Sequence, residues 1–324
     1  MGEFELIQRF FARPAQRAAL GTGDDCALLQ PADGMQLAIS SDMLVEGRHF
    51  LSTVDPAKLG HKALAVNLSD LAACGATPLA FTLALALPRA DESFLAPFSQ
   101  GLLALADAHG CELVGGDTTQ GPLNICITVF GEVPAGQALL RSGAKAGDDL
   151  YVSGTLGDAR LALEVFRGKL SVPQAVFDAA RARMEQPTPR VALGQALRGV
   201  ASSAIDLSDG LLGDLGHVLR ASGVGARIDT AVAIDLIAAY AEPVRAAAAF
   251  DAEAALEFVL AGGDDYELAF TAPVSARAAV QAAARATQTP VTRIGAIEAE
   301  PGLRLVGADG QLLTRRYASF DHFA

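Results

Sequence analysis

Aspartates in short glycine- and serine-rich stretches are the residues of this chain best suited to chemistry. A single aspartate in such a stretch usually caps a helix or forms a turn. Several carboxylates brought together repel one another unless they bind protons or a cation, and oxygen ligands of this kind favour Mg²⁺ over zinc. The pattern therefore predicts a magnesium site. The aspartates concerned are Asp24, Asp25, Asp42, Asp70, Asp117, Asp206, Asp209, Asp264 and Asp265.

A Mg²⁺ ion held by few carboxylates usually shares its other positions with water and with substrate phosphates. The chemistry expected is phosphoryl transfer or hydrolysis of a phosphate ester. The chain has no G-x-x-x-x-G-K-[ST] loop and no protein-kinase signature, so ATP would bind at a metal-rich site. The five histidines lack zinc-binding spacing, and no Ser–His or Cys–His pair indicates a covalent intermediate. We expect no residue to act as nucleophile or general base.

Composition limits the possible partners. The formal net charge is −12 and the basic residues are scattered, which argues against nucleic acid or a membrane as partner. No window approaches 18 uninterrupted apolar residues, and MGEFELIQRFF lacks the pattern of a secretory signal. Cys26, Cys74, Cys111 and Cys126 have no C-x-x-C spacing and are expected to be buried, reduced thiols. These features predict a cytoplasmic protein.

Strands and helices must position the aspartates. In the first half, β-branched residues and helical periodicity predict strands at 35–40, 81–88 and 124–133, and helices at 56–74 and 93–110. Asp42 is expected to follow the first of these strands, and Asp117 to end the apolar segment that contains it. In the second half, the predicted strands are 149–154, 267–272, 291–298 and 303–307, and the predicted helices are 157–167, 173–184, 190–199, 210–222 and 274–287.

A stretch rich in glycine and alanine, 134–148, separates the two halves. We place the domain boundary there, which gives domains 1–136 and 137–324. A length of 324 residues suits two domains of ordinary size. Because strands alternate with helices in both halves, the predicted fold class is α/β or α+β, with two domains.

A set of motifs, taken in order, resembles the thiamine-monophosphate kinase family. The motifs are GEFELIQRFF, GTGDDCALL, LAISSDMLVEGRHF, KALAVNLSDLAACGATP, LVGGDTTQGPL, RSGAKAGDDLYVSGTLGD, SSAIDLSDGLLGDLGHV, GGDDYELAFT and the terminal FDHF. They extend from residue 2 to residue 323, so the resemblance covers essentially the whole chain. The superfamily also contains aminoimidazole ribonucleotide synthetase, selenophosphate synthetase and a hydrogenase maturation factor, but the set as a whole is specific to the kinase.

The resemblance implies ATP-dependent phosphorylation of thiamine monophosphate to thiamine diphosphate. It also implies a homodimer whose N-terminal domains pair into a β-barrel-like interface, a C-terminal α/β domain, and an ATP cleft lined by several Mg²⁺ ions. The implied metal ligands are Asp25, Ser40, Ser41, Asp42, Asp70, Asp117, Asp206 and Asp209. The implied nucleotide contacts are Gly116, Asp117, Arg141 and Ser208, and the implied contacts with thiamine monophosphate are His49, Asp264 and Tyr317.

Three positions depart from the family pattern. Ser41 stands where threonine is frequent, and Asp264 where the family commonly has glutamate, which is one methylene longer. Tyr317 stands where some members carry tryptophan, and it can still stack on a flat heterocycle or its cation.

Some of these residues also fit structural roles. His49 has apolar neighbours and could be a half-buried structural histidine, and Arg141 could be a solvated side chain, although arginine also suits phosphate contacts. Asp24 and Asp265 are expected to cap helices or to support neighbouring ligands. Asp214 is expected to be a surface charge near a helix N-terminus.

The expected mechanism is direct in-line transfer of the γ-phosphoryl group to a phosphate oxygen of the acceptor. A phosphate monoester has a second pKa of about 6 and is already ionised near neutral pH, so it needs no strong general base. Two rival interpretations remain. One is another member of the superfamily, although no Gly-rich loop with a reactive Cys and a Lys precedes GTGDD. The other is a non-catalytic nucleotide- or Mg²⁺-binding protein, or a metal phosphohydrolase.

Overall fold

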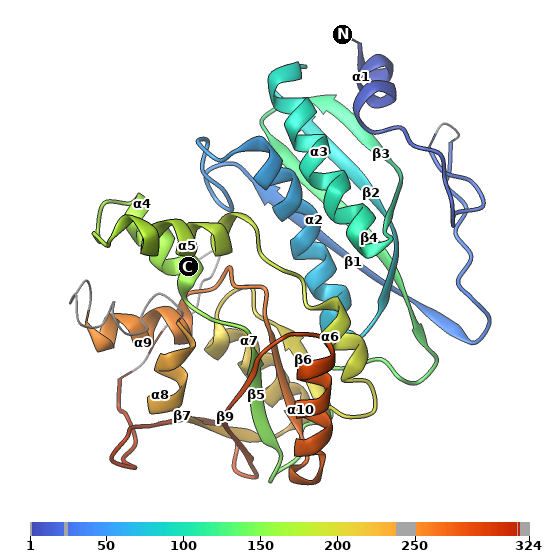
Figure 1. The fold of residues 1–324 in the computed structure, drawn as a ribbon. Helices are drawn as coiled ribbons and strands as arrows, with labels where there is room; N and C mark the ends of the chain where they lie inside the picture. The colour runs from blue at the N-terminus through green and yellow to red at the C-terminus, as the bar shows by residue number, and fades with distance from the viewer. Residues whose placement is uncertain (1, 23–24, 238–250, 316, 318–324) are drawn as a thin grey trace. The chain divides into compact units, whose positions relative to one another are not determined.

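The computed structural model describes residues 2–22, 25–237, 251–315 and 317 (Figure 1). The chain divides into two compact units, Met1–Leu71 with Ala76–Ala138, and Ala72–Gly75 with Leu139–Ala324. The division falls close to the boundary expected after residue 136, but it also places residues 72–75 in the second unit. Both units combine a sheet with helices, which confirms the predicted two-domain α/β class. No helix in the described ranges is long and apolar enough to cross a bilayer.

The first unit is built on a four-stranded sheet with strand order β1-β4-β2-β3. Strand β4 pairs antiparallel with β1 and with β2, and β2 pairs parallel with β3. The strands are β1 (Met35–Val45), β2 (Thr77–Leu87), β3 (Glu112–Gln120) and β4 (Asn124–Pro134), and the helices are α1 (Glu3–Phe10), α2 (Pro56–Ala73) and α3 (Glu92–His109). Helices α2 and α3 lie over one face of the sheet (Figure 1).

Two strands of the first unit place predicted ligands differently from the sequence-based expectation. Strand β1 continues to Val45, so Asp42 lies inside the strand instead of following it. The reason is that β1 pairs with β4 along its whole length, from Met35 opposite Pro134 to Val45 opposite Asn124. Asp117 likewise lies within β3, which continues to Gln120 beside β2.

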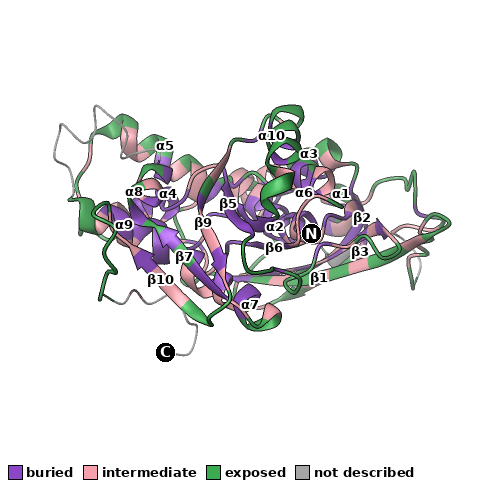
Figure 2. Cartoon of the chain, turned by 90° about the horizontal axis from the view of Figure 1, so that it is seen from below, coloured by how far each residue is buried: buried purple, intermediate pink, exposed green. Residues whose placement is uncertain are grey.

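The outer face of β1 is unusually apolar for an exposed strand. Alternation along the strand turns Leu37, Ile39 and Met43 away from α2, and they are 43%, 60% and 51% exposed. Figure 2 shows exposed stretches along β1, which is an edge strand of its sheet. Phe130 of β4 lies directly opposite Ile39 and therefore shares this face.

The second unit contains a six-stranded sheet with order β10-β7-β9-β5-β8-β6. All neighbouring strands are antiparallel except β10 and β7, which are parallel. The strands are β5 (Asp149–Ser153), β6 (Ser203–Asp206), β7 (Gly225–Asp229), β8 (Leu268–Ala272), β9 (Val291–Glu298) and β10 (Gly302–Val306). The helices are α4 (Asp158–Phe166), α5 (Gln174–Glu185), α6 (Val191–Ala196), α7 (Leu211–Ser222), α8 (Thr230–Ala233), α9 (Ala252–Ala261) and α10 (Arg277–Ala286), with short 3₁₀ turns at Ile234–Leu236 and Val274–Ala276.

The cysteines differ from the expectation of four buried thiols. Only Cys111 is buried, whereas Cys74 and Cys126 are half-buried and Cys26 is exposed. All four are free thiols. Burial raises the pKa of the Cys111 thiol to about 12, so this cysteine is a packing residue and a poor nucleophile.

Candidate functional site

In the first unit, β1 and α2 bring three predicted ligands to one place. Ser40 Oγ donates a hydrogen bond to Asp70 Oδ2 at 2.5 Å. The main-chain N–H of Asp42, on the free edge of β1, donates to Oδ1 of the buried Asn67 at 3.0 Å. Asn67 lies one helical turn before Asp70, so the two side chains share a face of α2. Sequence reasoning missed Asn67, although its spacing from Asp70 in NLSD was the available signal.

The side chain of Ser41 points to the opposite face of β1. Its hydroxyl lies 3.1 Å from Thr128 Oγ1 and donates to the main-chain oxygen of Ile127 at 3.1 Å. Successive side chains of a strand alternate between faces, so Ser41 cannot share the side-chain cluster of Ser40 and Asp70. Any contact of Ser41 with a cation beside Asp42 would have to come from its main chain.

Gly116 and Asp117 are exposed on β3. Gly116 has a φ of 143°, and a Cβ atom built on it would lie 1.9 Å from the main-chain oxygen of Leu83 in β2. Only glycine fits there, because any side chain would push β3 away from its parallel neighbour. Gly116 thus allows the β3 backbone beside Asp117 to lie close to β2.

His49 is half-buried in a tight turn at the end of β1. Its ring Nδ1 accepts a hydrogen bond from the main-chain N–H of Val45 at 3.0 Å, and the main-chain N–H of His49 donates to the Val45 carbonyl at 3.0 Å. Because Nδ1 is an acceptor, the neutral ring carries its proton on Nε2. The turn therefore fixes both the ring orientation and the tautomer.

Asp25 is exposed, and Asp24 lies outside the described residues. Residues 16–18, in the segment before Asp25, are hydrogen-bonded to Glu112 of β3. The carboxylate of Glu112 accepts hydrogen bonds from the N–H groups of Gln16, Arg17 and Ala18 at 3.0, 2.8 and 3.2 Å. Glu112 thereby ties the N-terminal segment to the strand that carries Asp117.

In the second unit, β6 ends at Asp206 and the loop that follows leads into α7. Asp206 is buried at 6% exposure, Asp209 is half-buried and Ser208 is exposed. The loop between β6 and α7 therefore presents side chains of graded exposure within four residues. Such a loop can bind a cation with its carboxylates and a ligand with its hydroxyl.

The prediction that Asp214 is a surface charge is wrong, because this residue of α7 is buried. Its side chain is 4% exposed. Oδ2 accepts hydrogen bonds from the main-chain N–H groups of Ser208, Asp209 and Gly210 at 3.0, 3.0 and 3.1 Å. Burial raises the pKa of Asp214 to about 6, although the three N–H groups oppose this shift.

A second loop, residues 262–266, packs against the first. The N–H of Asp264 donates to the Ser208 carbonyl at 2.7 Å, and the N–H of Tyr266 donates to the Leu207 carbonyl at 2.9 Å. Asp264 and Tyr266 both adopt left-handed backbone angles, with φ of 64° and 51°. Left-handed angles in non-glycine residues are strained, and they persist only where the surroundings impose them.

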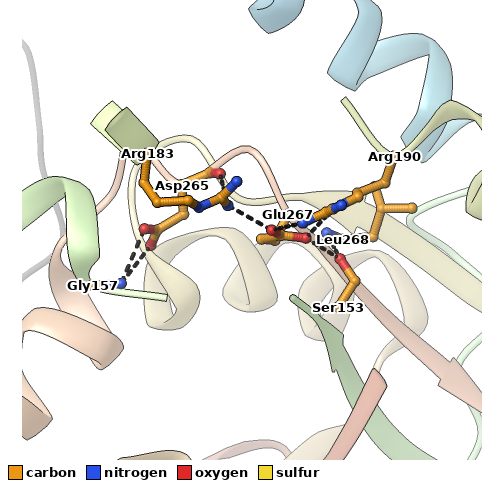
Figure 3. A network of polar contacts seen from close by, with 7 residues as sticks. All are labelled: Ser153, Gly157, Arg183, Arg190, Asp265, Glu267 and Leu268. Carbon is orange, nitrogen blue, oxygen red and sulfur yellow. Dashed lines mark hydrogen bonds and ion pairs between the residues drawn. The ribbon is translucent and has the colours of Figure 1, made fainter. Parts of the chain in front are cut away.

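The surroundings of this second loop are a buried polar network (Figure 3). Glu267 is fully buried, and its Oε1 and Oε2 accept hydrogen bonds from Arg190 Nη2 and Nε at 2.5 and 2.6 Å. Arg183 Nη2 donates to Oε1 at 2.6 Å, and Ser153 donates to Oε2 at 2.6 Å. No sequence pattern indicates this pairing, because the partners are far apart along the chain.

Asp265 completes the network. Its two oxygens accept the N–H of Gly157, which is the N-cap of α4, at 3.0 and 3.2 Å. The capping role expected for Asp265 thus matches its contacts. Burial, followed by the nearby Asp158, raises the pKa of Asp265 well above its usual value.

Arg141 and Tyr317 lie elsewhere in the second unit. Arg141 is exposed, and Ser222 Oγ donates to its carbonyl at 3.3 Å while accepting the N–H groups of Gly143 and Ala144, both at 3.2 Å. Tyr317 is half-buried and packs against the hydrophobic core of this unit. The guanidinium of Arg315 lies 5.3 Å from the centre of the Tyr317 ring, so the ring already stacks with a cation.

The donor atoms fit Mg²⁺ by their chemistry, since they are carboxylate and hydroxyl oxygens. Within the described ranges, no group of three or more His, Cys, Asp or Glu side chains lies close enough to hold a metal ion by itself. Each unit, taken by itself, has a small set of oxygen donors among the predicted ligands: Ser40, Asp42 and Asp70 in the first, Asp206 and Asp209 in the second. Such sets leave coordination positions for water and phosphate oxygens.

Comparison with known proteins shows the family to which the chain belongs. Residues 23–133 match the model of the AIR synthase related protein N-terminal domain, and residues 145–308 match that of its C-terminal domain. The chain is 48% identical over 330 residues to the thiamine-monophosphate kinase of Escherichia coli K12, covering 100% of this chain and 98% of the relative. This chain belongs to the thiamine-monophosphate kinase family. It is therefore an enzyme of the kinase class.

Solved structures of the thiamine-monophosphate kinase family have the same fold. The enzyme of Stenotrophomonas maltophilia K279a has a TM-score of 0.83 and 43% sequence identity, and 96% of each chain is covered. A structure described as AaThiL complexed with AMPPCP and TMP has a TM-score of 0.77 and 28% identity, with 91% of this chain and 89% of the other covered.

Proposed function

We propose that this protein uses ATP to phosphorylate thiamine monophosphate and so produces thiamine diphosphate. The observation that carries the proposal is the 48% identity to a thiamine-monophosphate kinase along the whole chain. A related structure that contains AMPPCP and TMP supports an ATP-like donor and this acceptor. We further propose that the protein acts in the cytoplasm, which its four free thiols support.

The proposed metal ligands are the oxygen donors of both units, with Ser41 contributing through its main chain. Bound Mg²⁺ would offset the negative charge of the phosphates on an acidic protein. The hydrogen bond from Ser40 to Asp70 and the exposure of Asp117 support the set in the first unit. The proposed ligands are Asp25, Ser40, Ser41, Asp42, Asp70, Asp117, Asp206 and Asp209.

The chain's other residues bind and orient the two substrates. We propose nucleotide contacts at Gly116, Asp117, Arg141 and Ser208, and acceptor contacts at His49, Asp264 and Tyr317. The tautomer of His49 supports its role, because a proton on Nε2 can be donated to an oxygen of the acceptor. Transfer would be direct and in line, since an ionised phosphate acceptor requires no protein base or nucleophile.

We also propose that the protein is a homodimer that pairs through the first unit in a β-barrel-like interface. The apolar outer face of β1, with Leu37, Ile39 and Met43 exposed, supports this arrangement. An exposed edge strand of this kind is a ready template for pairing with a second copy.

A coupled assay for ADP, run with and without thiamine monophosphate, tests the proposal. We expect ADP formation that depends on the acceptor and stops when EDTA removes Mg²⁺. Asp42→Asn and Asp117→Asn should lose most activity. Asp107→Asn should keep it, because Asp107 is an exposed residue of α3 that pairs with Arg13. Full Mg²⁺-dependent activity in either site variant would contradict the ligand assignment. Phosphate release without acceptor would indicate a hydrolase, and no turnover would indicate a binding protein.

A further inference from the structure

The loop between β6 and α7 directs three successive N–H groups at a single point. The N–H groups of Ser208, Asp209 and Gly210 all donate to Oδ2 of Asp214, at 3.0, 3.0 and 3.1 Å. Converging N–H groups at the start of a helix form an anion-binding nest. In many nucleotide-binding proteins such a nest holds a phosphate group. Here a carboxylate of the chain itself fills it.

The opposite side of the same loop is also held. The carbonyls of Leu207 and Ser208 accept hydrogen bonds from Tyr266 and Asp264 at 2.9 and 2.7 Å. Gly263 makes this approach possible, because a Cβ atom there would lie 2.7 Å from the Ser208 carbonyl oxygen. The backbone of the loop is therefore fixed through its N–H groups on one side and its carbonyls on the other.

Because the N–H groups of residues 208–210 are already bonded to Asp214, they do not contact a ligand, and the side chains of the loop remain to do so. Ser208 is exposed and Asp209 is half-buried, whereas Asp214 is 4% exposed. Burying a carboxylate costs free energy unless hydrogen bonds compensate it, and three N–H groups supply that compensation here. The arrangement keeps a negative charge beside Asp209 in a place that a phosphate group would otherwise occupy.

We propose that Asp214 is a positioning residue that fills the N–H nest of residues 208–210 and keeps phosphate out of it. The nucleotide is thereby directed to the Ser208 hydroxyl and to a cation on the Asp209 carboxylate, and not to the backbone of the loop. The proposal rests on the proposed function in so far as the ligand is a magnesium nucleotide. Asp214 itself does not touch the substrates.

Amide hydrogen exchange and binding of AMPPCP with Mg²⁺ test the proposal in the full-length protein. In Asp214→Ala we expect faster exchange at residues 208–210, with β5 unchanged, and an affinity for the magnesium nucleotide lowered about 10- to 100-fold. Formate, a free carboxylate, should slow exchange at 208–210 in this variant and have no effect on the wild type. Asp214→Asn keeps an uncharged acceptor and should show smaller changes in the same direction.

Asp229→Ala is the matched control. Asp229 also accepts a main-chain N–H at a helix start in the second unit, from Ala231 at 3.1 Å, but it supports α8 and not the loop. Equal losses of nucleotide affinity in Asp229→Ala and Asp214→Ala would overturn the proposal, as would unchanged exchange at 208–210. If Asp214→Ala does not fold, wild-type exchange and affinity in Asp214→Asn would overturn it. None of these measurements uses thiamine monophosphate, so they are independent of whether that acceptor is phosphorylated.

Discussion

At the scale of single residues, hydrogen bonds from main-chain N–H groups mark the aspartates that shape the backbone. Asp117 is exposed, whereas Asp214 and Asp265 are buried and accept main-chain N–H groups. The motifs predicted candidate ligands, but they could not predict side-chain direction. Ser41 faces away from Asp70, and Asp214 turns inward, because strand alternation and the course of the loop decide both directions.

Gly116→Ala should damage the site through the backbone. The new Cβ atom would meet the Leu83 carbonyl oxygen at 1.9 Å, and alanine is strained at a φ of 143°. We expect the free energy of unfolding to fall by about 2 kcal/mol or more, with weaker AMPPCP binding. Urea unfolding and calorimetric titration measure the two effects.

Gly115→Ala is the control for this change, since a Cβ atom there meets only Thr82 Cγ2, at 3.8 Å. If both variants behave alike, the close approach of β3 to β2 is not what requires glycine at position 116.

At the scale of elements, two neighbouring strands carry the loops of the second unit. Strand β6 leads into the loop of Ser208 and Asp209, and β8 follows the loop of Asp264, so their antiparallel pairing brings the loops together. The sequence predicted β8 and α7 from their apolar patterns. It missed β7 and α9, and it gave no element for β3, whose glycines and polar residues are held in a strand by pairing with β2.

Arg190→Met should destabilise the loop that carries Asp264. The change removes a bidentate partner of the fully buried Glu267 and leaves Arg183 and Ser153 to satisfy it. We expect the free energy of unfolding to fall by about 3 kcal/mol, because a buried charge loses its principal partner. Arg227→Met removes a pair in which the exposed Arg227 lies 3.8 Å from an oxygen of the half-buried Glu298, and it should cost about 1 kcal/mol or less. Similar losses in both variants by chemical denaturation would refute this expectation.

Asp149 should make the second unit sensitive to acid. Hydrogen bonds from Arg277, at 2.6 and 2.8 Å, hold the pKa of the Asp149 carboxyl below its ordinary value of 3.8. Because the pKa is lower in the folded than in the unfolded state, the ionised Asp149 stabilises the folded protein. This contribution is complete above about pH 4 and disappears as the pH falls through the folded-state pKa. Asp149→Asn should therefore lose less stability than the wild type over that interval. Parallel denaturation curves of the two proteins against pH would contradict this linkage.

At the scale of the whole molecule, the proposed function requires an acidic chain to bind two phosphate-bearing substrates. With a net charge of −12, such a chain would depend on cations to bind them. The alternation of strands and helices was sufficient to predict two α/β domains. The proposed pairing of two copies could not be derived in this way, because the apolar outer face of β1 is visible only once the strand register is known.

Ile39→Asp should convert the proposed dimer into a monomer. Ile39 is 60% exposed at the middle of the apolar face of β1, and a buried carboxylate in an interface without a partner is strongly unfavourable. Light scattering coupled to size-exclusion chromatography measures the mass. Val274→Asp, at an exposed apolar position of the second unit, should leave the mass unchanged. A wild-type monomer, or a dimeric Ile39→Asp variant, would exclude this interface.

The left-handed backbone of Asp264 and Tyr266 has a consequence for laboratory evolution. A left-handed residue costs about 1–3 kcal/mol, so a glycine in place of Asp264 would make the protein more resistant to heat, whereas Tyr266 is 8% exposed and a small residue there would lose its packing. A library screened only for thermal survival should therefore enrich substitutions in this loop. Because the same loop presents Asp264, those survivors should turn over more slowly, and the screen would select against the activity it was meant to preserve.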